Sequence, residues 1–354
     1  MAKLPISVLI DTYNHERFIE KAINSVLEQD FPAAEREIIV VDDGSTDRTP
    51  QIVQRFEPRL RYIRKENGGQ ASAFNVGIPE CQGQIITFLD GDDYWLPGKL
   101  SRVAEVLTKN PAVGLVGHAI KEFLPNGHER ISAPARDEEL RINSVESAKR
   151  FRLRKSFLGT SRMTMRAEIA RNILPVPEAL LFEADEYLFT LAAVMSDVII
   201  LREPLTCYVI HGSNLYMSAV GKSGLRRKQQ VMAALASSLQ RILRAQGLTA
   251  DVVDCVVEII QAEADRFRLM LDGGARWETV RAENKLFEVL HRDASNSQKF
   301  FRTLSMIPAF LLPPRWFYAG RQWLGKRPWY RNIRQESLPV PGITAVTSSE
   351  ESKI

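Results

Sequence analysis

Ile85-Ile86-Thr87-Phe88-Leu89-Asp90-Gly91-Asp92-Asp93 is an apolar run that ends abruptly in carboxylates. The run is short and rich in β-branched and aromatic residues, so we expect a buried strand over residues 84–89. The intervening glycine permits a sharp turn that presents Asp90 and Asp92 to one ion. Taken alone, Asp-Gly-Asp is more often a solvated turn, so its meaning depends on the neighbouring segments.

Strand-like segments at 6–10, 37–41 and 60–63 precede this run and alternate with helix-like ones. This alternation predicts βα units and an α/β fold with a mainly parallel central sheet. The carboxyl ends of parallel strands meet at one edge, where ligands bind in such folds. Three polar segments follow these strands: Asp11-Thr12-Tyr13-Asn14, Asp42-Asp43-Gly44-Ser45 and Glu66-Asn67-Gly68-Gly69-Gln70.

Carboxylates from separate strands would share a cleft at this edge, and their repulsion must be offset by a cation or by hydrogen-bond donors. Hard oxygen ligands suit Mg²⁺ or Mn²⁺, which can bridge the two phosphates of a nucleoside diphosphate. Asp42 and Asp43 have two interpretations: a βα turn whose Ser45 caps the next helix, or acceptors for a base or ribose hydroxyl. The Gly68-Gly69 segment matches neither GxGxxG nor a Walker motif.

The composition is that of an ordinary globular chain of 354 residues, and its net charge of +4 does not by itself imply nucleic acid. Three cysteines at wide spacing, without a CxxC pair, disfavour zinc or redox chemistry and favour a reducing compartment. Neither a signal-peptide pattern nor an apolar run of about 18 residues occurs. We therefore expect a cytoplasmic protein whose membrane contact is at most peripheral.

Three regions are expected along the chain. Residues 1–220 form a catalytic domain, in which a polar segment from about 126 to 146 is predicted to be an insertion or mobile loop. Residues 221–336 are helix-rich, with almost no turn signals before Asp272-Gly273-Gly274. Residues 337–354 have few large apolar groups and are predicted to be a disordered tail. Short strand-like runs are expected at 160–165, 198–201 and 207–210.

Residues 306–335 join an apolar stretch to a segment in which Arg and Lys are interleaved with Trp, Tyr and Phe, and they contain no acidic residue. One interpretation is an interfacial position on the inner face of an anionic membrane. Another is that the aromatic residues pack within the helical region while the basic groups stay solvated. RNA binding is a weaker third interpretation, and we expect no nucleic-acid partner.

The segments Ile6–Asn14, Val41–Asp47 and Phe88–Asp93 together resemble glycosyltransferase family 2 in order and spacing. The resemblance implies a GT-A fold, a nucleotide-diphosphate sugar donor with UDP as the first choice, and transfer with inversion. A glycan or lipid-linked acceptor in bacterial surface-glycan assembly is the corresponding hypothesis. Two later segments also resemble family landmarks: Ala184–Leu188 and Tyr208–Asn214.

The resemblance also assigns roles to single residues. Asp92 is the principal metal ligand and Asp90 serves the ribose and the metal. Asp11 departs from the family, which usually has proline at this position. The remaining donor-binding residues that it indicates are Thr12, Tyr13, Asp42, Asp43, Gln70 and Gly91.

Inversion requires a general base on the acceptor side, and the family places an acidic motif at a helix start. Asp185 is the matching candidate, with Glu183 and Glu186 in reserve. The alternative is that these acids only complement the helix dipole. His211 follows a strand-like run and is either a metal ligand or a structural histidine, whereas His15 has no comparable context.

The leading hypothesis is thus a metal-dependent, inverting glycosyltransferase. A catalytically silent nucleotide-sugar-binding scaffold is the alternative, because GT-A folds can persist after losing the base. A processive synthase is disfavoured by the absence of a membrane-span pattern. A nucleotidyltransferase would need a basic phosphate-binding loop after the first strand, and Asp11-Thr12-Tyr13-Asn14 supplies none.

Overall fold

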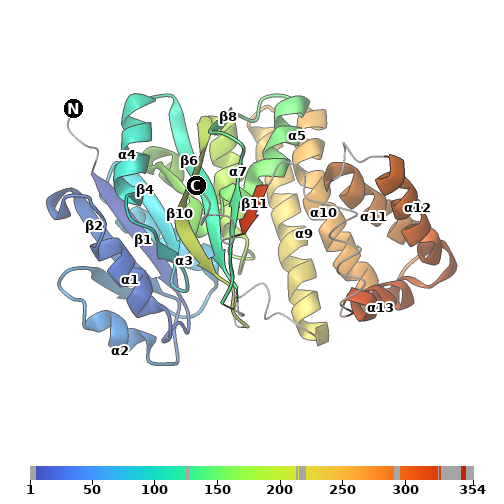
Figure 1. The fold of residues 1–354 in the computed structure, drawn as a ribbon, viewed down its shortest axis with the longest axis horizontal. Helices are drawn as coiled ribbons and strands as arrows, with labels where there is room; N and C mark the ends of the chain where they lie inside the picture. The colour runs from blue at the N-terminus through green and yellow to red at the C-terminus, as the bar shows by residue number, and fades with distance from the viewer. Residues whose placement is uncertain are drawn as a thin grey trace. The chain divides into compact units, whose positions relative to one another are not determined.

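The computed structural model describes residues 5–124, 127–212, 214, 221–290, 296–325, 327 and 344–347. The chain divides into two compact units, which Figure 1 shows as ribbons. The first consists of Met1–Asn214 with Ile343–Ile354, and the second of Leu215–Gly342.

The first unit is built on one sheet whose strand order begins β3-β2-β1-β4. These four strands, β1 (Ile6–Thr12), β2 (Arg36–Asp42), β3 (Arg61–Arg64) and β4 (Ile85–Asp90), run parallel to one another, as the sequence predicts. Beyond β4 the sheet is mixed, because β9 pairs with both β4 and β6 in the antiparallel sense. The other strands are β5 (Tyr94–Trp95), β6 (Val113–Phe123), β7 (Glu129–Ala133), β8 (Glu138–Leu140), β9 (Thr164–Arg166), β10 (Asp197–Val209) and β11 (Thr344–Thr347).

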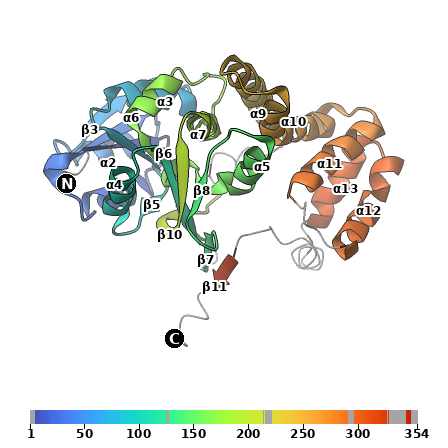
Figure 2. The ribbon, with the colours of Figure 1, turned by 90° about the horizontal axis from the view of Figure 1, so that it is seen from above.

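Helices cover both faces of this sheet, and the alternation of apolar residues along β1 explains why. Val8 and Ile10 belong to the core shared with α1, α2 and α4. Leu9 points to the opposite face, where it lies against Gly77 of α3. Figure 2 shows α3, α6 and α7 together on that second face. The bounds are α1 (Ile19–Leu27), α2 (Thr49–Gln54), α3 (Gln70–Glu80), α4 (Lys99–Lys109), α5 (Val145–Arg154), α6 (Ala167–Ile173) and α7 (Ala184–Met195).

The structure corrects or refines four predictions about local structure. The segment from about 126 to 146 contains β7 and β8, which pair with β6 and β10, and the first residues of α5. Thr160–Arg162 is a 3-10 turn that precedes a shorter strand, β9. The two expected runs at 198–201 and 207–210 are parts of the single strand β10. Within the predicted disordered tail, residues 344–347 form β11 against β7, and the rest of that tail lies outside the described residues.

The second unit is helical: α9 (Gly221–Ala245), α10 (Ala250–Asp272), α11 (Arg276–Leu290), α12 (Asn296–Leu311) and α13 (Pro314–Gly325). The break between α9 and α10 was not predicted from the sequence, and Gly247 adopts a positive φ of 83° there. A small core joins α10 to α13 through Leu269, Met306 and Phe317. Across the described ranges, every helix is too short or too polar to cross a membrane.

Candidate active site

The predicted convergence of strand ends is present in the first unit. Asp11 of β1 is the registered partner of Asp90 in β4, and Thr12 is the partner of Asp42 in β2. The backbone N–H groups that follow these strands also connect them: that of Asp43 donates to the Thr12 carbonyl, and that of Gly91 donates to the Asp11 carbonyl. The polar segments of three strands therefore form one continuous edge.

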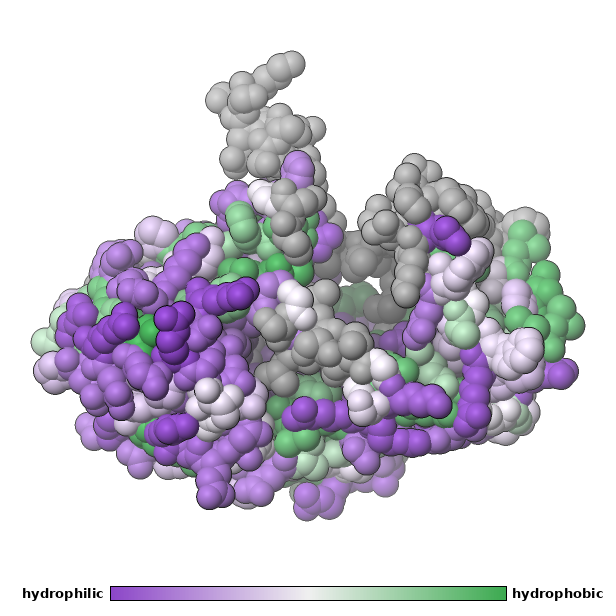
Figure 3. Space-filling model, turned by 90° about the horizontal axis from the view of Figure 1, so that it is seen from below, coloured by the Kyte–Doolittle hydropathy of each residue, from purple (hydrophilic) through white to green (hydrophobic). Residues whose placement is uncertain are grey.

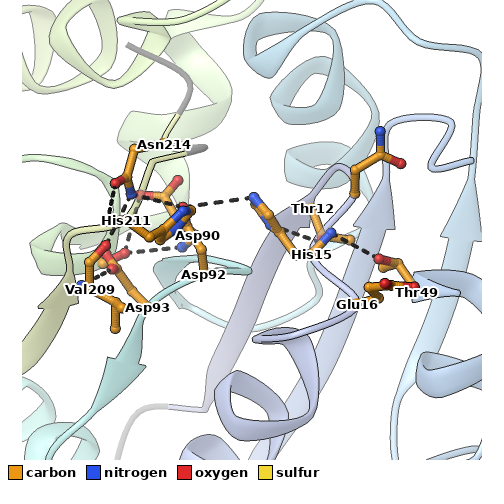
Figure 4. A network of polar contacts seen from close by, with 12 residues as sticks. Thr12, His15, Glu16, Thr49, Asp90, Asp92, Asp93, Val209, His211 and Asn214 are labelled. Carbon is orange, nitrogen blue, oxygen red and sulfur yellow. Dashed lines mark hydrogen bonds and ion pairs between the residues drawn. The ribbon is translucent and has the colours of Figure 1, made fainter. Parts of the chain in front are cut away.

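Asp92 lies at the centre of a polar network at this edge (Figure 4). Its Oδ2 accepts hydrogen bonds from His211 Nε2 at 3.1 Å and Asn214 Nδ2 at 3.2 Å, and His15 Nε2 is 3.7 Å away. The His211 ring stacks on Phe18, the residue that precedes α1, with centroids 4.3 Å apart. The structure thus brings the predicted residues Asp92 and His211 together.

His15 is the residue that the sequence analysis missed. Its Nδ1 lies 3.1 Å from Thr12 Oγ1, and its backbone N–H donates to Thr49 Oγ1. Burial lowers the pKa of His15, although the charge of Asp92 opposes that shift. A neutral imidazole has a free ring nitrogen that can bind a cation. Its position immediately after the Asp11-Thr12-Tyr13-Asn14 segment was the available signal.

Gly91 is required at its position because there is no room for a side chain. A Cβ there would lie 2.5 Å from Thr12 Oγ1 and 2.8 Å from His15 Nδ1. Both separations are shorter than any van der Waals contact to carbon. The glycine of the Asp-Gly-Asp segment therefore lets β1 and the β4 turn approach each other closely.

Negative charge is concentrated around Asp92. Burial, followed by the charge of Asp11, raises the pKa of Asp90 well above its usual value. Burial and the charge of Asp92 do the same for Asp11, and they raise the pKa of Asp93 to about 8. Burial would also raise the pKa of Asp92, but the hydrogen bond from His211 and the charges of His15 and His211 lower it. Of Asp11, Asp90, Asp92 and Asp93, Asp92 is therefore the carboxylate that stays ionised most readily.

Asp42 and Asp43 are both buried, and their oxygens are already engaged. Asp42 accepts hydrogen bonds from the Ser45 N–H at 2.7 Å and the Tyr62 hydroxyl at 2.6 Å. Asp43 accepts from the N–H groups of Gly68 and Gly69, at 2.9 and 2.7 Å, and pairs with Lys65. These contacts join the β2 edge to the turn before α3. In this arrangement both carboxylates shape the loops of the edge.

Asp185 lies in the first turn of α7, on the face of the sheet to which Asp11 and Asp90 point. Its Oδ2 accepts from the N–H and Oγ1 of Thr160, at 3.0 and 3.2 Å, and its Oδ1 accepts from the Glu186 N–H. Gln70 fixes this region, because it donates to Thr160 Oγ1 and accepts from the N–H of Ala184. Asp185 raises the pKa of both Asp11 and Asp90, so it lies within electrostatic reach of the edge.

The two reserve candidates have different surroundings. Glu186 is buried, and both of its oxygens pair with Lys155, at 2.7 and 2.9 Å. Glu183 adopts a left-handed backbone conformation with φ of 60° at the start of α7. Of the three acids, Asp185 alone combines partial exposure with a position in the helix facing the Asp11 and Asp90 carboxylates.

Divalent cations such as Mg²⁺ and Mn²⁺ need hard oxygen ligands, and the carboxylates of this edge are of that kind. In the part of the chain that the structure describes, no three His, Cys, Asp or Glu side chains form a ready metal cage. Mg²⁺ and Mn²⁺ are commonly held by one or two carboxylates together with substrate phosphates, so a complete protein cage is not required. Asp11 Oδ1 is buried without a hydrogen-bond partner, which leaves a carboxyl oxygen near Asp92 that no donor of the chain satisfies. The residues therefore fit a cation that bound phosphates help to hold.

Comparison with known proteins identifies the fold and its relatives. The family model described as Glycosyl transferase family 2 matches residues 7–174. An uncharacterized glycosyltransferase of Nostoc sp. is 32% identical over 226 residues, which are 61% of this chain and 68% of that protein. The poly(ribitol-phosphate) beta-N-acetylglucosaminyltransferase TarS of Staphylococcus aureus is 39% identical over 95 residues, 26% of this chain but only 17% of TarS.

Two solved structures are similar over most of the chain. TarS residues 1–349 in complex with UDP-GlcNAc has a TM-score of 0.53 at 22% identity, with 81% of this chain and 90% of that chain covered. The mannosyltransferase PcManGT of Pyrobaculum calidifontis, in complex with GDP-Man and Mn²⁺, has a TM-score of 0.53 at 18% identity, with 95% and 85% covered. At these identities the similarity establishes the GT-A fold with its C-terminal helices.

Proposed function

The chain belongs to glycosyltransferase family 2, and from that premise we propose that it transfers a sugar, with inversion, from a nucleoside-diphosphate donor to a glycan or lipid-linked acceptor. The observation that carries this proposal is the arrangement around Asp92. Its carboxylate is flanked by His15, His211 and Asn214, and Asp185 faces the same edge. Sugar transfer from a nucleoside diphosphate needs a cation beside the departing phosphates and a proton acceptor beside the acceptor hydroxyl, so the two functions must lie side by side.

Asp92 is the proposed principal metal ligand, assisted by Asp90 and His211. His15 is added to this set because its Nε2 also faces Asp92 Oδ2. Bound there, Mg²⁺ or Mn²⁺ would supply positive charge for the departing diphosphate. The cluster of buried carboxylates is an argument for a bound cation, because without one the carboxylates relieve their mutual repulsion only by taking up protons.

Asp185 is the proposed general base. Its carboxylate accepts the proton of the acceptor hydroxyl while that oxygen forms a bond to the anomeric carbon and the bond to the diphosphate breaks on the opposite side. Thr160 and the Glu186 N–H hold the carboxylate in one orientation. An oriented carboxylate is what in-line displacement needs, because a misplaced base loses most of its effect.

Donor recognition is proposed for Thr12, Tyr13 and Gly91 at the strand ends. Gln70 would act through Thr160 and α7, which it connects. Asp42 and Asp43 are proposed to help hold the base and ribose mainly by shaping the surrounding loops, because their oxygens already accept hydrogen bonds within the chain. The TarS complex with UDP-GlcNAc supports a UDP-sugar as the donor class, and the PcManGT complex makes GDP-mannose the second choice.

The competing function is a catalytically silent nucleotide-sugar-binding scaffold. The observation that favours it is that Asp185 already accepts three hydrogen bonds from its own chain. Contacts of this kind are also what a purely structural carboxylate in the first turn of a helix would make. Donor binding without turnover would therefore identify the scaffold.

Calorimetric titration of UDP, GDP and dTDP, each with Mn²⁺ and with a chelator, tests the proposal. We expect UDP to bind only with Mn²⁺, and Asp92→Asn to abolish that binding. Asp251→Asn, an exposed aspartate of α10, is the matched control and should bind UDP as the wild type does. If no nucleotide bound under either condition, the proposed donor site would be wrong.

A further inference from the structure

The helix α12 carries large apolar side chains on its outward face as well as apolar side chains on its inward face. Its inward face carries Arg302, Met306 and Ala309, all buried. Its outward face carries large apolar side chains that are about half exposed or more: Leu304, Ile307, Phe310 and Leu311, at 48, 48, 59 and 65%. Figure 3 shows this as green surface at the right-hand end of the view, where α12 lies in Figure 1.

The inward face is fixed by charge. Glu283 of α11 is buried and pairs with Arg302 of α12 and Arg321 of α13. Arg302 also donates a hydrogen bond of 2.6 Å to the Glu283 carbonyl. Rotating α12 to bury its apolar face would leave Glu283 and Arg302 without each other, and an unpaired buried charge is strongly unfavourable. The outward direction of Ile307 and Phe310 is therefore built into the fold.

The neighbouring helix α13 extends the same kind of surface. Trp316 and Trp323 are 71 and 57% exposed, and the guanidinium of Arg327 lies 4.5 Å from the Trp323 ring centroid. Arg315 is exposed between α12 and Trp316. The sequence from Asn296 to Gln335 contains no Asp or Glu. Exposed apolar, tryptophan and arginine side chains without acids suit the boundary between lipid headgroups and acyl chains.

We propose that the outward surface of α12 and α13 binds the headgroup region of an anionic lipid bilayer. The surface is defined as Leu304, Ile307, Phe310, Leu311, Arg315, Trp316 and Trp323. Charge favours lipid over a second copy of the chain, because a symmetric dimer would place the helices α12 and α13, which carry Arg and Lys but no acid, against themselves, and the acid that Arg315 acts on, Asp272, belongs to α10. This inference does not rest on the transfer reaction. Of the expected segment 306–335, residues 326 and 328–335 lie outside the described residues.

The test is co-sedimentation of the full chain with phosphatidylcholine vesicles and with equimolar phosphatidylcholine–phosphatidylglycerol vesicles. We expect binding to the anionic vesicles that weakens with added salt. Phe310→Ser combined with Leu311→Ser should lower the affinity about tenfold or more, since two large apolar side chains no longer enter the interface. Arg315→Gln should lower it about fivefold for anionic vesicles only.

Two matched controls separate this surface from general effects. Phe123→Ser removes an exposed aromatic residue of β6, and Arg244→Gln removes an exposed charge of α9, so both should bind vesicles as the wild type does. Circular dichroism would confirm that each variant is folded. If neither kind of vesicle bound the wild type, the proposal would be overturned. It would also be overturned if the Phe310 and Leu311 changes abolished self-association in sedimentation velocity without lipid, and a protein partner would then cover this surface.

Discussion

Asp11 and Asp90 are registered partners on the adjacent parallel strands β1 and β4, so both carboxyl groups point to the sheet face that α3 and α7 cover. Two carboxylates this close cannot both ionise freely, and burial adds to the effect. The pair therefore disfavours folding at neutral pH in the absence of a cation.

Asp11→Asn should make the metal-free protein more stable at pH 7. The folded pKa of Asp11 is raised above the unfolded value of 3.8, so its contribution to stability is full below pH 3.8 and is lost as the pH rises toward the folded pKa. Each unit of raised pKa corresponds to about 1.4 kcal/mol. Urea unfolding in the presence of a chelator at pH 4 and pH 7 checks this. The variant and the wild type should have roughly equal free energies of unfolding at pH 4, and the variant should be more stable at pH 7. A difference in the free energy of unfolding between variant and wild type that is the same at pH 4 and pH 7 would contradict the prediction. An equal gain in stability for Asp251→Asn would also contradict it.

Asp185→Asn should keep donor binding and lose turnover. The amide preserves the shape of the side chain but cannot accept a proton, so we expect UDP release from UDP-GlcNAc to fall by about 10²–10⁴-fold. Calorimetry of UDP with Mn²⁺ supplies the second readout and should give wild-type affinity. The neighbouring Glu186→Gln is an unsuitable control, because it breaks a buried ion pair with Lys155. Near-normal turnover of Asp185→Asn would refute the assignment of the base.

Gly91→Ala should weaken Mn²⁺-dependent UDP binding and destabilise the protein by roughly 1–3 kcal/mol, because the added methyl group overlaps Thr12 and His15. Thermal unfolding and calorimetry measure the two effects. Gly320→Ala is the matched control, since a Cβ at that helical position meets nothing within 4 Å. The control should be neutral or slightly stabilising. Equal behaviour of the two variants would show that the close approach at Gly91 is not needed.

His118→Gln should change the pH dependence of stability in the opposite sense to Asp11→Asn. Burial, followed by the charge of Lys99, lowers the pKa of His118 well below 6.5. The unfolded state therefore binds the extra proton as the pH falls below about 6.5, and stability drops by up to about 1.4 kcal/mol per pH unit. Between pH 6.5 and pH 5 the free energy of unfolding of the variant should fall less steeply than that of the wild type, and the slopes should differ by up to about 1.4 kcal/mol per pH unit. The exposed His128→Gln should behave as the wild type.

The sequence predicted the part of the fold that short-range patterns determine. The four parallel strands and the gathering of Asp11, Asp42 and Asp90 at one edge follow from βα alternation and were confirmed. The polar strand β7 was missed, because its Glu129 and Arg130 side chains pair with charged residues of β6 rather than with an apolar core. Such a strand is specified by its partner, which lies elsewhere in the sequence.

The carboxylates of the candidate site could be predicted from the sequence, but the side chains that surround them could not. Asp90 and Asp92 stand out because they end an apolar run. His15 does not, since only the close approach of β1 and the β4 turn at Gly91 brings its ring to Asp92. The engagement of Asp43 by Gly69 was likewise invisible, because it depends on the path of the turn before α3, and the engagement of Asp42 by Tyr62 depends on the pairing of β2 with β3.

His211 reaches Asp92 from 119 residues further along the chain. During synthesis, a ribosome-bound chain that has released β1 to β4 already contains Asp90, Asp92 and His15, but it lacks the second imidazole and Asn214. The polar cluster around Asp92 is therefore completed only after β10 has taken its place beside β6 and positioned the segment that follows it. A nascent chain therefore lacks the proposed donor and cation site until residues up to Asn214 have been released.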